Sequence, residues 1–151
     1  MREIIFRGKE KHTAKWVYGG FACKDDTTYA FAEDYERYPV DKKYYIVEDE
    51  MTDWGLPNRL ACYEVMRETI GQYTGLTDKN GKKIFEGDIL RYIDEDGESH
   101  YITVVFEECA FLIEDDGITD PDLLTSYGCL GLEVFGNIHD NPGLLSERSS
   151  T

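Results

Sequence analysis

Residues 86–106, Glu-Gly-Asp-Ile-Leu-Arg-Tyr-Ile-Asp-Glu-Asp-Gly-Glu-Ser-His-Tyr-Ile-Thr-Val-Val-Phe, carry the strongest fold signal in the chain. Two runs rich in β-branched and aromatic residues, 89–93 and 100–106, flank the turn sequence Asp94-Glu95-Asp96-Gly97. Such runs on either side of Asp and Gly are typical of a β-hairpin. The earlier turn, Glu86-Gly87-Asp88, sets the start of the first strand. The stretch therefore predicts an antiparallel hairpin.

Strand patterns continue on both sides of this hairpin. Short aromatic and β-branched runs bounded by turn residues predict further strands at 3–7, 14–18, 43–47, 110–113 and 132–135, and residues 62–69 favour a strand over a short helix. Gly8, Gly19-Gly20 and Glu48-Asp49-Glu50 are expected to end the first three of these strands. Residues 48–59 and 115–122 are expected to be loops, and 121–127 a helical turn.

The strands lie too close together in sequence for crossover helices, so antiparallel pairing is expected. The predicted fold is mainly β. It places a small SH3-like or related barrel, or a bent antiparallel sheet, in the C-terminal half, with an N-terminal β-rich appendage. The predicted parts are residues 1–62, residues 63–145 with the barrel-like sheet, and a disordered tail at 146–151.

The chain is strongly acidic, and its charge is unevenly placed. Asp and Glu number 31 against 16 Lys and Arg, a net charge of −15, and residues 84–147 hold sixteen acids and one base. Phosphate binding needs Lys and Arg, so direct nucleic-acid binding is disfavoured. The acidic segment is either a solvated surface or a face that binds a basic protein partner. No apolar run long enough to span a membrane occurs, and the chain opens without a secretory signal pattern.

No pattern for metal binding or catalysis is present in the sequence. The cysteines stand at 23, 62, 109 and 129 and the histidines at 12, 100 and 139, so neither type forms the closely spaced pairs of a structural zinc site. A Gly-rich phosphate loop, a G-x-S-x-G elbow and an H-E-x-x-H motif are also missing. We therefore expect no cofactor, no metal and no catalytic residues, and reduced thiols in a cytoplasmic protein.

Two polar segments, residues 72–89 and 136–142, mix Gly, Asn and Asp with isolated apolar residues. This mixture is typical of tight turns pinned to a core. At least two of the four glycines Gly75, Gly81, Gly87 and Gly136 are expected to adopt positive φ. The apolar anchors of these turns are expected to be buried: Leu76, Ile84, Phe85 and Ile138. The side chains of Asp88 and Asn137 are expected to accept hydrogen bonds from turn amides. The residues singled out, for a binding or a structural role, are Gln72, Gly75, Asp78, Asn80, Gly81, Gly87, Asp88, Gly136, Asn137, His139 and Asp140. The alternative is a ligand pocket formed by Gln72, Asp78, Asn80, Asp88, His139 and Asp140.

Several motifs follow one another in a fixed order along the chain. They are Arg-Glu-Ile-Ile-Phe-Arg at 2–7, Gln-Tyr-Thr-Gly-Leu at 72–76, Asp-Lys-Asn-Gly-Lys-Lys-Ile-Phe at 78–85, Glu-Gly-Asp-Ile at 86–89, Val-Phe-Gly-Asn-Ile at 134–138, and Asn-Pro at 141–142. In this order they resemble the YopX-like family of phage and prophage proteins; residues 23–62 carry no motif of that family. The resemblance implies a phage or prophage origin, a product in the cytoplasm of a bacterial host and a mostly β fold. It implies no reaction and no catalytic residue.

Three classes of function remain open at this point. We favour a non-enzymatic protein-interaction module, with a protein partner or a second copy of itself, anchored by exposed aromatic residues. The second class is an acidic mimic of nucleic acid that acts on a DNA-binding enzyme. It requires a continuous outward stripe of carboxylates that includes Asp94, Glu98, Glu107, Asp116 and Asp122. The third is an enzyme whose pocket gathers residues remote in sequence, such as His100, His139 and Cys109.

Overall fold

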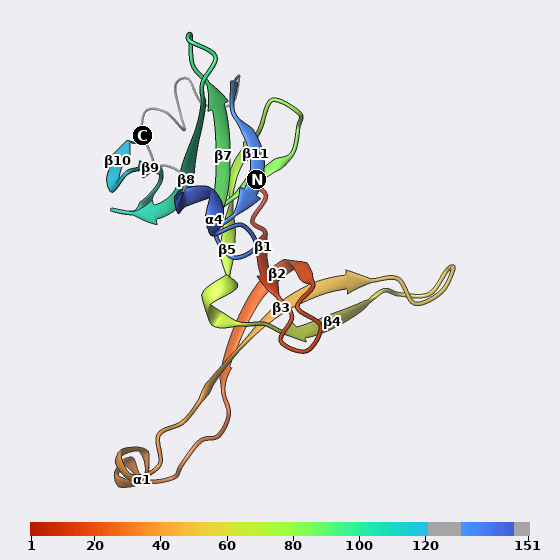
Figure 1. The fold of residues 1–151 in the computed structure, drawn as a ribbon. Helices are drawn as coiled ribbons and strands as arrows, with labels where there is room; N and C mark the ends of the chain where they lie inside the picture. The colour runs from red at the N-terminus through yellow and green to blue at the C-terminus, as the bar shows by residue number, and fades with distance from the viewer. Residues whose placement is uncertain (121–130, 147–151) are drawn as a thin grey trace. The chain divides into compact units, whose positions relative to one another are not determined.

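The hairpin predicted from residues 86–106 is present in the computed structural model of the chain, which describes residues 1–120 and 131–146 (Figure 1). Its strands are β7 (Asp88–Ile93) and β8 (Ser99–Glu107), which pair antiparallel without interruption. In the turn between them, the Asp94 carboxylate accepts two backbone amides, at 3.0 and 2.8 Å. This use of an Asp side chain stabilises the tight turn that the sequence predicts.

Contacts between residues divide the chain into two compact units. The N-terminal unit is Ile5–Ile70, and the C-terminal unit is Gly71–Thr151 together with Met1–Ile4. The domain boundary that the sequence places after residue 62 stays a prediction.

The C-terminal unit is built on a five-stranded antiparallel sheet in the order β10-β9-β8-β7-β11. Besides the central hairpin, its strands are β9 (Ala110–Asp115), β10 (Ile118–Asp120) and β11 (Glu133–Asn137). The unit also contains an antiparallel pair, β5 (Gly71–Thr77) with β6 (Lys83–Phe85), and a short helix, α4 (Gly143–Ser146).

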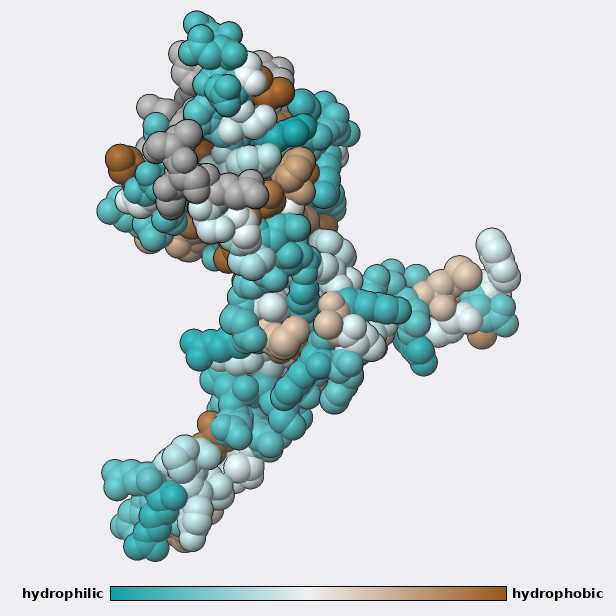
Figure 2. Space-filling model, in the orientation of Figure 1, coloured by the Kyte–Doolittle hydropathy of each residue, from teal (hydrophilic) through white to brown (hydrophobic). Residues whose placement is uncertain are grey.

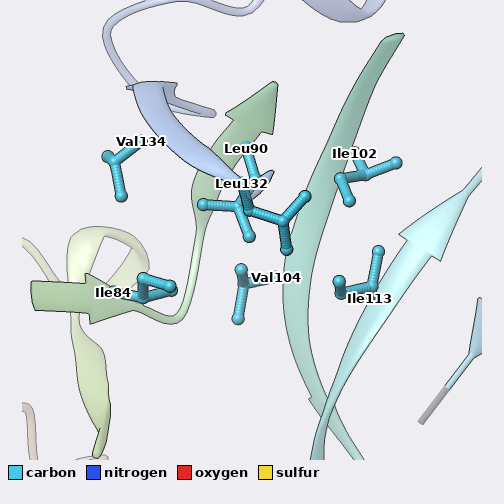
Figure 3. Close-up of a cluster of buried hydrophobic side chains, with 7 residues drawn as sticks. All are labelled: Ile84, Leu90, Ile102, Val104, Ile113, Leu132 and Val134. Atoms are coloured by element: carbon cyan, nitrogen blue, oxygen red, sulfur yellow. The ribbon is translucent and has the colours of Figure 1, made fainter. Parts of the chain in front are cut away.

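A buried apolar cluster holds the C-terminal unit together. Side chains alternate between the two faces of a strand, so Ile102 and Val104 of β8 lie on the same face and enter one core. Each fully buried aliphatic side chain contributes roughly 1.5–3 kcal/mol relative to an exposed one. The cluster consists of Ile84, Leu90, Ile102, Val104, Ile113, Leu132 and Val134 (Figure 3).

The N-terminal unit contains four neighbouring antiparallel strands, in the order β4-β3-β2-β1. Its elements are β1 (Phe6–Lys9), β2 (Trp16–Asp25), α1 (Ala32–Arg37), β3 (Lys42–Glu50), β4 (Arg59–Glu64) and the 3₁₀ turn η1 (Arg67–Thr69). The first half of β3 pairs with β2 and the second half with β4, so the two hairpin connections lie at opposite ends of β3. We call residues 26–41 the α1 end and residues 51–58 the β3–β4 end. Figure 1 shows them leaving the sheet in different directions.

Little of the N-terminal unit is buried. Ile46 and Val65 are its buried hydrophobic residues in the part of the chain that the structure describes. A close backbone approach takes the place of side-chain packing at one point: a Cβ on Gly19 would clash with the carbonyl oxygen of Val47. Glycine is therefore required where β2 passes the backbone of β3.

The mainly β fold class predicted from the sequence is confirmed. Strands predominate over helices in both units, and the neighbours in each described sheet pair antiparallel. Of the two forms predicted for the C-terminal half, the described residues form the bent antiparallel sheet rather than a closed barrel. Its strand order ends at β10 and β11.

Several predicted boundaries in the N-terminal unit are wrong. Gly8 lies inside β1, and β2 continues through Gly19-Gly20 to Asp25. β3 continues through Glu48-Asp49-Glu50, where Glu50 forms an ion pair with Arg59 of β4 at 2.6 Å. Glycine and clustered acids disfavour strands locally, but pairing with a neighbouring strand overrides that preference.

Other sequence predictions concern the segment at the end of β4, the connections that follow β9, and the C-terminal tail. The segment 62–69 is partly strand, as β4, and partly the 3₁₀ turn η1. Within the predicted loop 115–122, residues 118–120 form β10 and pair with β9, so the loop prediction is wrong there. The predicted helical turn at 121–127 lies outside the described residues. Of the tail predicted at 146–151, Ser146 is the last residue of α4, and residues 147–151 lie outside the described residues. No helix in the described ranges is both long and apolar enough to cross a membrane.

Candidate functional site

The structure brings the two polar segments of the sequence together in the C-terminal unit. β11 pairs with β7, so that Asn137 lies opposite Asp88. The amide of Ile138 donates to the carbonyl oxygen of Gly87 at 2.9 Å, and the amide of Lys79 donates to that of Leu132 at 3.0 Å. Residues far apart in sequence therefore form one connected set of turns.

Asp78 is the central polar group of this set. Its side chain is 5% exposed. One carboxylate oxygen accepts the amides of Asn80 at 2.8 Å and Lys82 at 2.9 Å, and the other accepts the amide of Val134 at 2.9 Å. Burial by itself raises the pKa of the Asp78 carboxyl, but these backbone hydrogen bonds outweigh it and hold the pKa below its usual value. Asp78 thus fastens β11 to the turn between β5 and β6.

Asp88 and Asn137 do what the sequence predicts, because both accept turn amides. Asp88 Oδ2 accepts the amide of Phe85 at 2.8 Å. Asn137 Oδ1 accepts the amides of His139 at 3.0 Å and Asp140 at 2.9 Å. These are the local side-chain to backbone hydrogen bonds by which Asp and Asn stabilise turns.

The glycine prediction is confirmed. Gly75, Gly81 and Gly87 adopt φ values of +92°, +80° and +81°. Gly136 is explained by a close approach instead, since a Cβ there would clash with the side chain of Asn141.

Burial of the apolar anchors is only half as predicted. Ile84 and Phe85 are buried, at 0% and 4% exposure. Leu76 and Ile138 are only partly buried, so for them the prediction is wrong. Leu76 packs against the rim of the core cluster and leaves one side to solvent.

These contacts explain much of the motif as turn scaffolding. The acceptors of Asp78, Asp88 and Asn137 face backbone amides, while Gln72 is half-buried and Asn80 exposed. A pocket that joins the six polar side chains stays a prediction. Two hollows among the described residues lie in the N-terminal unit.

The surface of the N-terminal unit offers a different kind of site. Fifteen large hydrophobic residues are exposed in the described part of the chain, and nine of them belong to this unit. They concentrate at the two hairpin ends: Phe31, Tyr35 and Tyr38 at the α1 end, and Met51, Trp54 and Leu56 at the β3–β4 end. Figure 2 shows apolar residues on the surface of the β3–β4 end. Trp54 is 87% exposed.

The aromatic residues of the α1 end form a small ordered cluster. The rings of Tyr29 and Tyr35 meet edge to face, with centroids 5.2 Å apart, and Tyr38 lies 6.2 Å from Tyr29. The Tyr35 hydroxyl accepts the amide of Tyr29 at 3.0 Å. Sequence reasoning missed this cluster because residues 23–42 are polar on average. The spacing of Phe31, Tyr35 and Tyr38, at i, i+4 and i+7, is a helical pattern that could have shown it.

The sheet between the hairpin ends carries an apolar hollow of about 340 Å³. Ala22 of β2, Tyr45 and Val47 of β3, and Cys62 of β4 line it, together with Cys23 and Lys24. A larger hollow of about 720 Å³ in the same unit is lined by residues that include Lys11 and Glu64. The hydrogen bond from Lys11 to Glu64, at 2.9 Å, lowers the pKa of the Glu64 carboxyl.

The described carboxylates invoked for nucleic-acid mimicry lie at separate strand ends and turns. Asp94 and Glu98 are at one end of β8, and Glu107 ends β8 at the other. A strand of this length spans about 30 Å. Asp116 belongs to the turn between β9 and β10, and Asp122 lies outside the described residues.

The histidines and cysteines are equally dispersed. His100 Nε2 lies 2.7 Å from Asp94 Oδ2, and this hydrogen bond holds the pKa of the Asp94 carboxyl below its usual value. His139 belongs to the turn after β11, and Cys109 to the turn between β8 and β9. Within residues 1–120 and 131–146, no three or more His, Cys, Asp or Glu side chains are grouped so that they could hold a metal ion.

One comparison with known proteins shows the family. A family model described as "YopX protein" matches residues 5–146. A similar solved structure is the crystal structure of protein EF1440 from Enterococcus faecalis. That structure is 22% identical, covers 96% of this chain and 99% of its own, and has a TM-score of 0.49. No curated protein matches the sequence significantly.

Proposed function

The chain belongs to the YopX protein family, and we propose that it is a non-enzymatic protein-interaction module whose binding surface lies on the N-terminal unit. One observation carries this proposal. The N-terminal unit exposes nine large hydrophobic residues and buries two, and the exposed ones gather at its hairpin ends. Hydrophobic residues scattered singly over a surface need no explanation, but clustered ones mark interaction sites.

The chemistry of the hairpin ends fits a protein partner. Trp and Tyr concentrate binding energy in protein interfaces because they bury much area at little cost in conformational entropy. The α1 end combines its tyrosine cluster with three acids in one helix, Glu33, Asp34 and Glu36, beside one base, Arg37. Protein interfaces usually have an apolar, aromatic-rich centre surrounded by a polar rim, and the α1 end has both.

Charge supports a protein partner over a nucleic acid for both units. The N-terminal unit holds ten bases and thirteen acids, and the C-terminal unit holds six bases and eighteen acids. A net negative charge on each unit opposes phosphate binding. We place the protein in the cytoplasm of a bacterial host and assign it a phage or prophage origin, on the motifs that it shares with its family.

The test compares partner capture by variants of the two units. Trp54→Ser with Leu56→Ser, and Phe31→Ser with Tyr38→Ser, remove the exposed anchors of each hairpin end. The matched control is Ile118→Ser in the C-terminal unit, because Ile118 is 72% exposed and outside the proposed surface. The tagged full chain is cross-linked in host extract, and captured proteins are quantified by mass spectrometry.

We expect a defined partner to be captured by the wild type and by Ile118→Ser, and to be lost from one or both hairpin-end variants. All variants should unfold within about 0.5 kcal/mol of the wild type, because the substituted residues are exposed. Equal capture by all variants, or no partner above background, would contradict the proposal.

A further inference from the structure

β4 stands at the end of its strand order, and part of its outer edge is open. It pairs with β3 through an uninterrupted register, from Glu64 opposite Tyr45 to Arg59 opposite Glu50. Natural edge strands are usually blocked by a proline, a lysine, a bulge or a covering segment. β4, Arg-Leu-Ala-Cys-Tyr-Glu, contains no proline or lysine, and its register shows no bulge. Its charged residues stand only at its ends, where Arg59 pairs with Glu50 and Glu64 pairs with Lys11.

The direction of the backbone groups along β4 follows from one hydrogen bond. The amide of Val65 donates to the carbonyl oxygen of Tyr44 at 2.9 Å, so Val65 faces β3. Backbone groups alternate along an antiparallel strand, so those of Leu60 and Cys62 point away from β3. The next outward carbonyl, that of Glu64, already accepts the amide of Lys11 at 2.9 Å. The free edge is therefore the short stretch centred on Ala61.

The side chains at this edge are apolar and open. Leu60 is 72% exposed, and Cys62 is exposed as well. Cys62 lies opposite Val47, and Leu60 is two residues away, so all three lie on one face. That face contains the apolar hollow of about 340 Å³.

We infer that a second copy of this chain pairs with β4, antiparallel and across a two-fold axis at Ala61. This inference goes beyond the proposed function, because it uses the edge of β4 rather than the hairpin ends and names a second copy of the chain as the occupant. The outward groups of Leu60 and Cys62 then meet those of Cys62 and Leu60 in the partner, which gives four backbone hydrogen bonds. Leu60 lies opposite an apolar residue, and Ala61 lies opposite itself.

Neighbouring registers fit less well. In a continuous sheet, residues that lie opposite each other on neighbouring strands point their side chains to the same face. A two-fold axis perpendicular to the sheet meets this condition only if it passes through a residue rather than between two residues. An axis at Cys62 would place Leu60 opposite Glu64, whose carbonyl oxygen is already used by Lys11. An axis at Leu60 would need Asn58, which lies outside the strand. Small isologous contacts of this kind are typical of weak, concentration-dependent dimers.

The test is site-specific disulfide trapping in the full chain with all four native cysteines replaced by serine. In the inferred dimer, the two Ala61 residues face each other in a non-hydrogen-bonded pair with their Cα atoms about 4.5 Å apart. Ala61→Cys should therefore form a disulfide-linked dimer on mild oxidation. Leu60→Cys in the same background is the matched control, because its two Cα atoms would lie about 8 Å apart, too far for a disulfide.

Light scattering over a concentration series gives a readout without cross-linking. The wild type should shift toward the mass of a dimer as concentration rises, and Leu60→Lys should stay monomeric, because it places like charges on an edge. Equal cross-linking at positions 60 and 61, no cross-linking at position 61, or an unchanged wild-type mass would overturn the inference. Loss of the dimer with unchanged partner capture at the hairpin ends would leave the proposed function standing, so the two failures are distinguishable.

Discussion

The two units of this protein use their apolar residues in opposite ways. Thirteen hydrophobic residues are buried in the described part of the chain, and eleven of them belong to the C-terminal unit. The N-terminal unit buries Ile46 and Val65 and exposes nine large hydrophobic residues. Burial of apolar surface is the main source of folding stability. In the C-terminal unit the hydrophobic residues therefore mainly stabilise the fold, whereas in the N-terminal unit most of the large ones are exposed to solvent.

The sharpest way to break this comparison is to shorten one leucine in each unit. Leu90 is fully buried in the core cluster, whereas Leu60 is 72% exposed. Leu90→Ala should lower the free energy of unfolding by about 2–5 kcal/mol, through lost transfer energy and a cavity. Leu60→Ala should change it by less than about 0.5 kcal/mol. Urea denaturation followed by circular dichroism measures both, and similar losses for the two variants would refute the contrast.

The next test concerns the buried carboxylate that locks the C-terminal unit. Asp78→Asn replaces one acceptor oxygen by an amide group, so either Val134 or the turn amides of Asn80 and Lys82 lose their partner. Leaving a buried donor unpaired costs about 1–3 kcal/mol. Glu64→Gln is the control in the N-terminal unit. Its pKa is also lowered, by Lys11, but the group is accessible and screened, so a smaller effect is expected.

The sign of the pH dependence follows from the lowered pKa of Asp78. Its contribution is present above the unfolded-state pKa of about 3.9 and is lost as pH falls through the folded-state value. The stability difference between wild type and Asp78→Asn should therefore shrink on acidification below about pH 4. A constant difference from pH 7 to pH 2 would mean that the charge of Asp78 does not matter.

A third test asks whether the N-terminal unit has any tightly packed point. Gly19→Ala places a Cβ against the carbonyl oxygen of Val47, a backbone atom that cannot move away cheaply. We expect a loss of about 1–3 kcal/mol, typical of overpacking. Gly20→Ala is the matched control, because the nearest atom to its Cβ is 3.8 Å away. Hydrogen exchange of the backbone amides in β2 and β3 measures the effect locally. Equal protection of these amides in Gly19→Ala and Gly20→Ala would mean that the backbone adjusts to the new Cβ without loss of stability.

The sequence predicted the C-terminal unit better than the N-terminal one, for physical reasons. The hairpin of β7 and β8 follows from local pattern, since Ile89 to Ile93 and the Asp94–Gly97 turn each prefer their observed conformation. Gly75, Gly81 and Gly87 were predictable because positive φ is a property of single residues. By contrast, β2 continues through Gly19-Gly20 because of pairing with β3, which no local pattern encodes.

The candidate site shows the same division. Acceptance of turn amides by Asp88 and Asn137 was predictable, because Asp and Asn do so within a few residues of themselves. The third bond of Asp78, to Val134, crosses 56 positions and could not be predicted from spacing. The aromatic residues of the hairpin ends were missed because the exposure of a side chain depends on the tertiary structure. Trp54, for example, is a residue type often found in cores, but it lies on the surface.

The smallest expected effect tests whether the exposed aromatic cluster of the α1 end is itself ordered. Tyr35→Phe keeps the ring that meets Tyr29 edge to face and removes the hydroxyl that accepts the Tyr29 amide. Water can replace that acceptor at an exposed site, so the free energy of unfolding should change by less than about 0.5 kcal/mol. The Tyr29 amide should nevertheless exchange faster with solvent, because its hydrogen bond is local to the α1 end. Tyr38→Phe is the control, since its ring also meets Tyr29 at 6.2 Å and the bond from the Tyr29 amide goes to Tyr35. Hydrogen exchange measured by NMR distinguishes the two variants. Unchanged exchange at Tyr29 in Tyr35→Phe would mean that the cluster is not held by this hydrogen bond, and the N-terminal unit would then present its aromatic residues without a fixed arrangement.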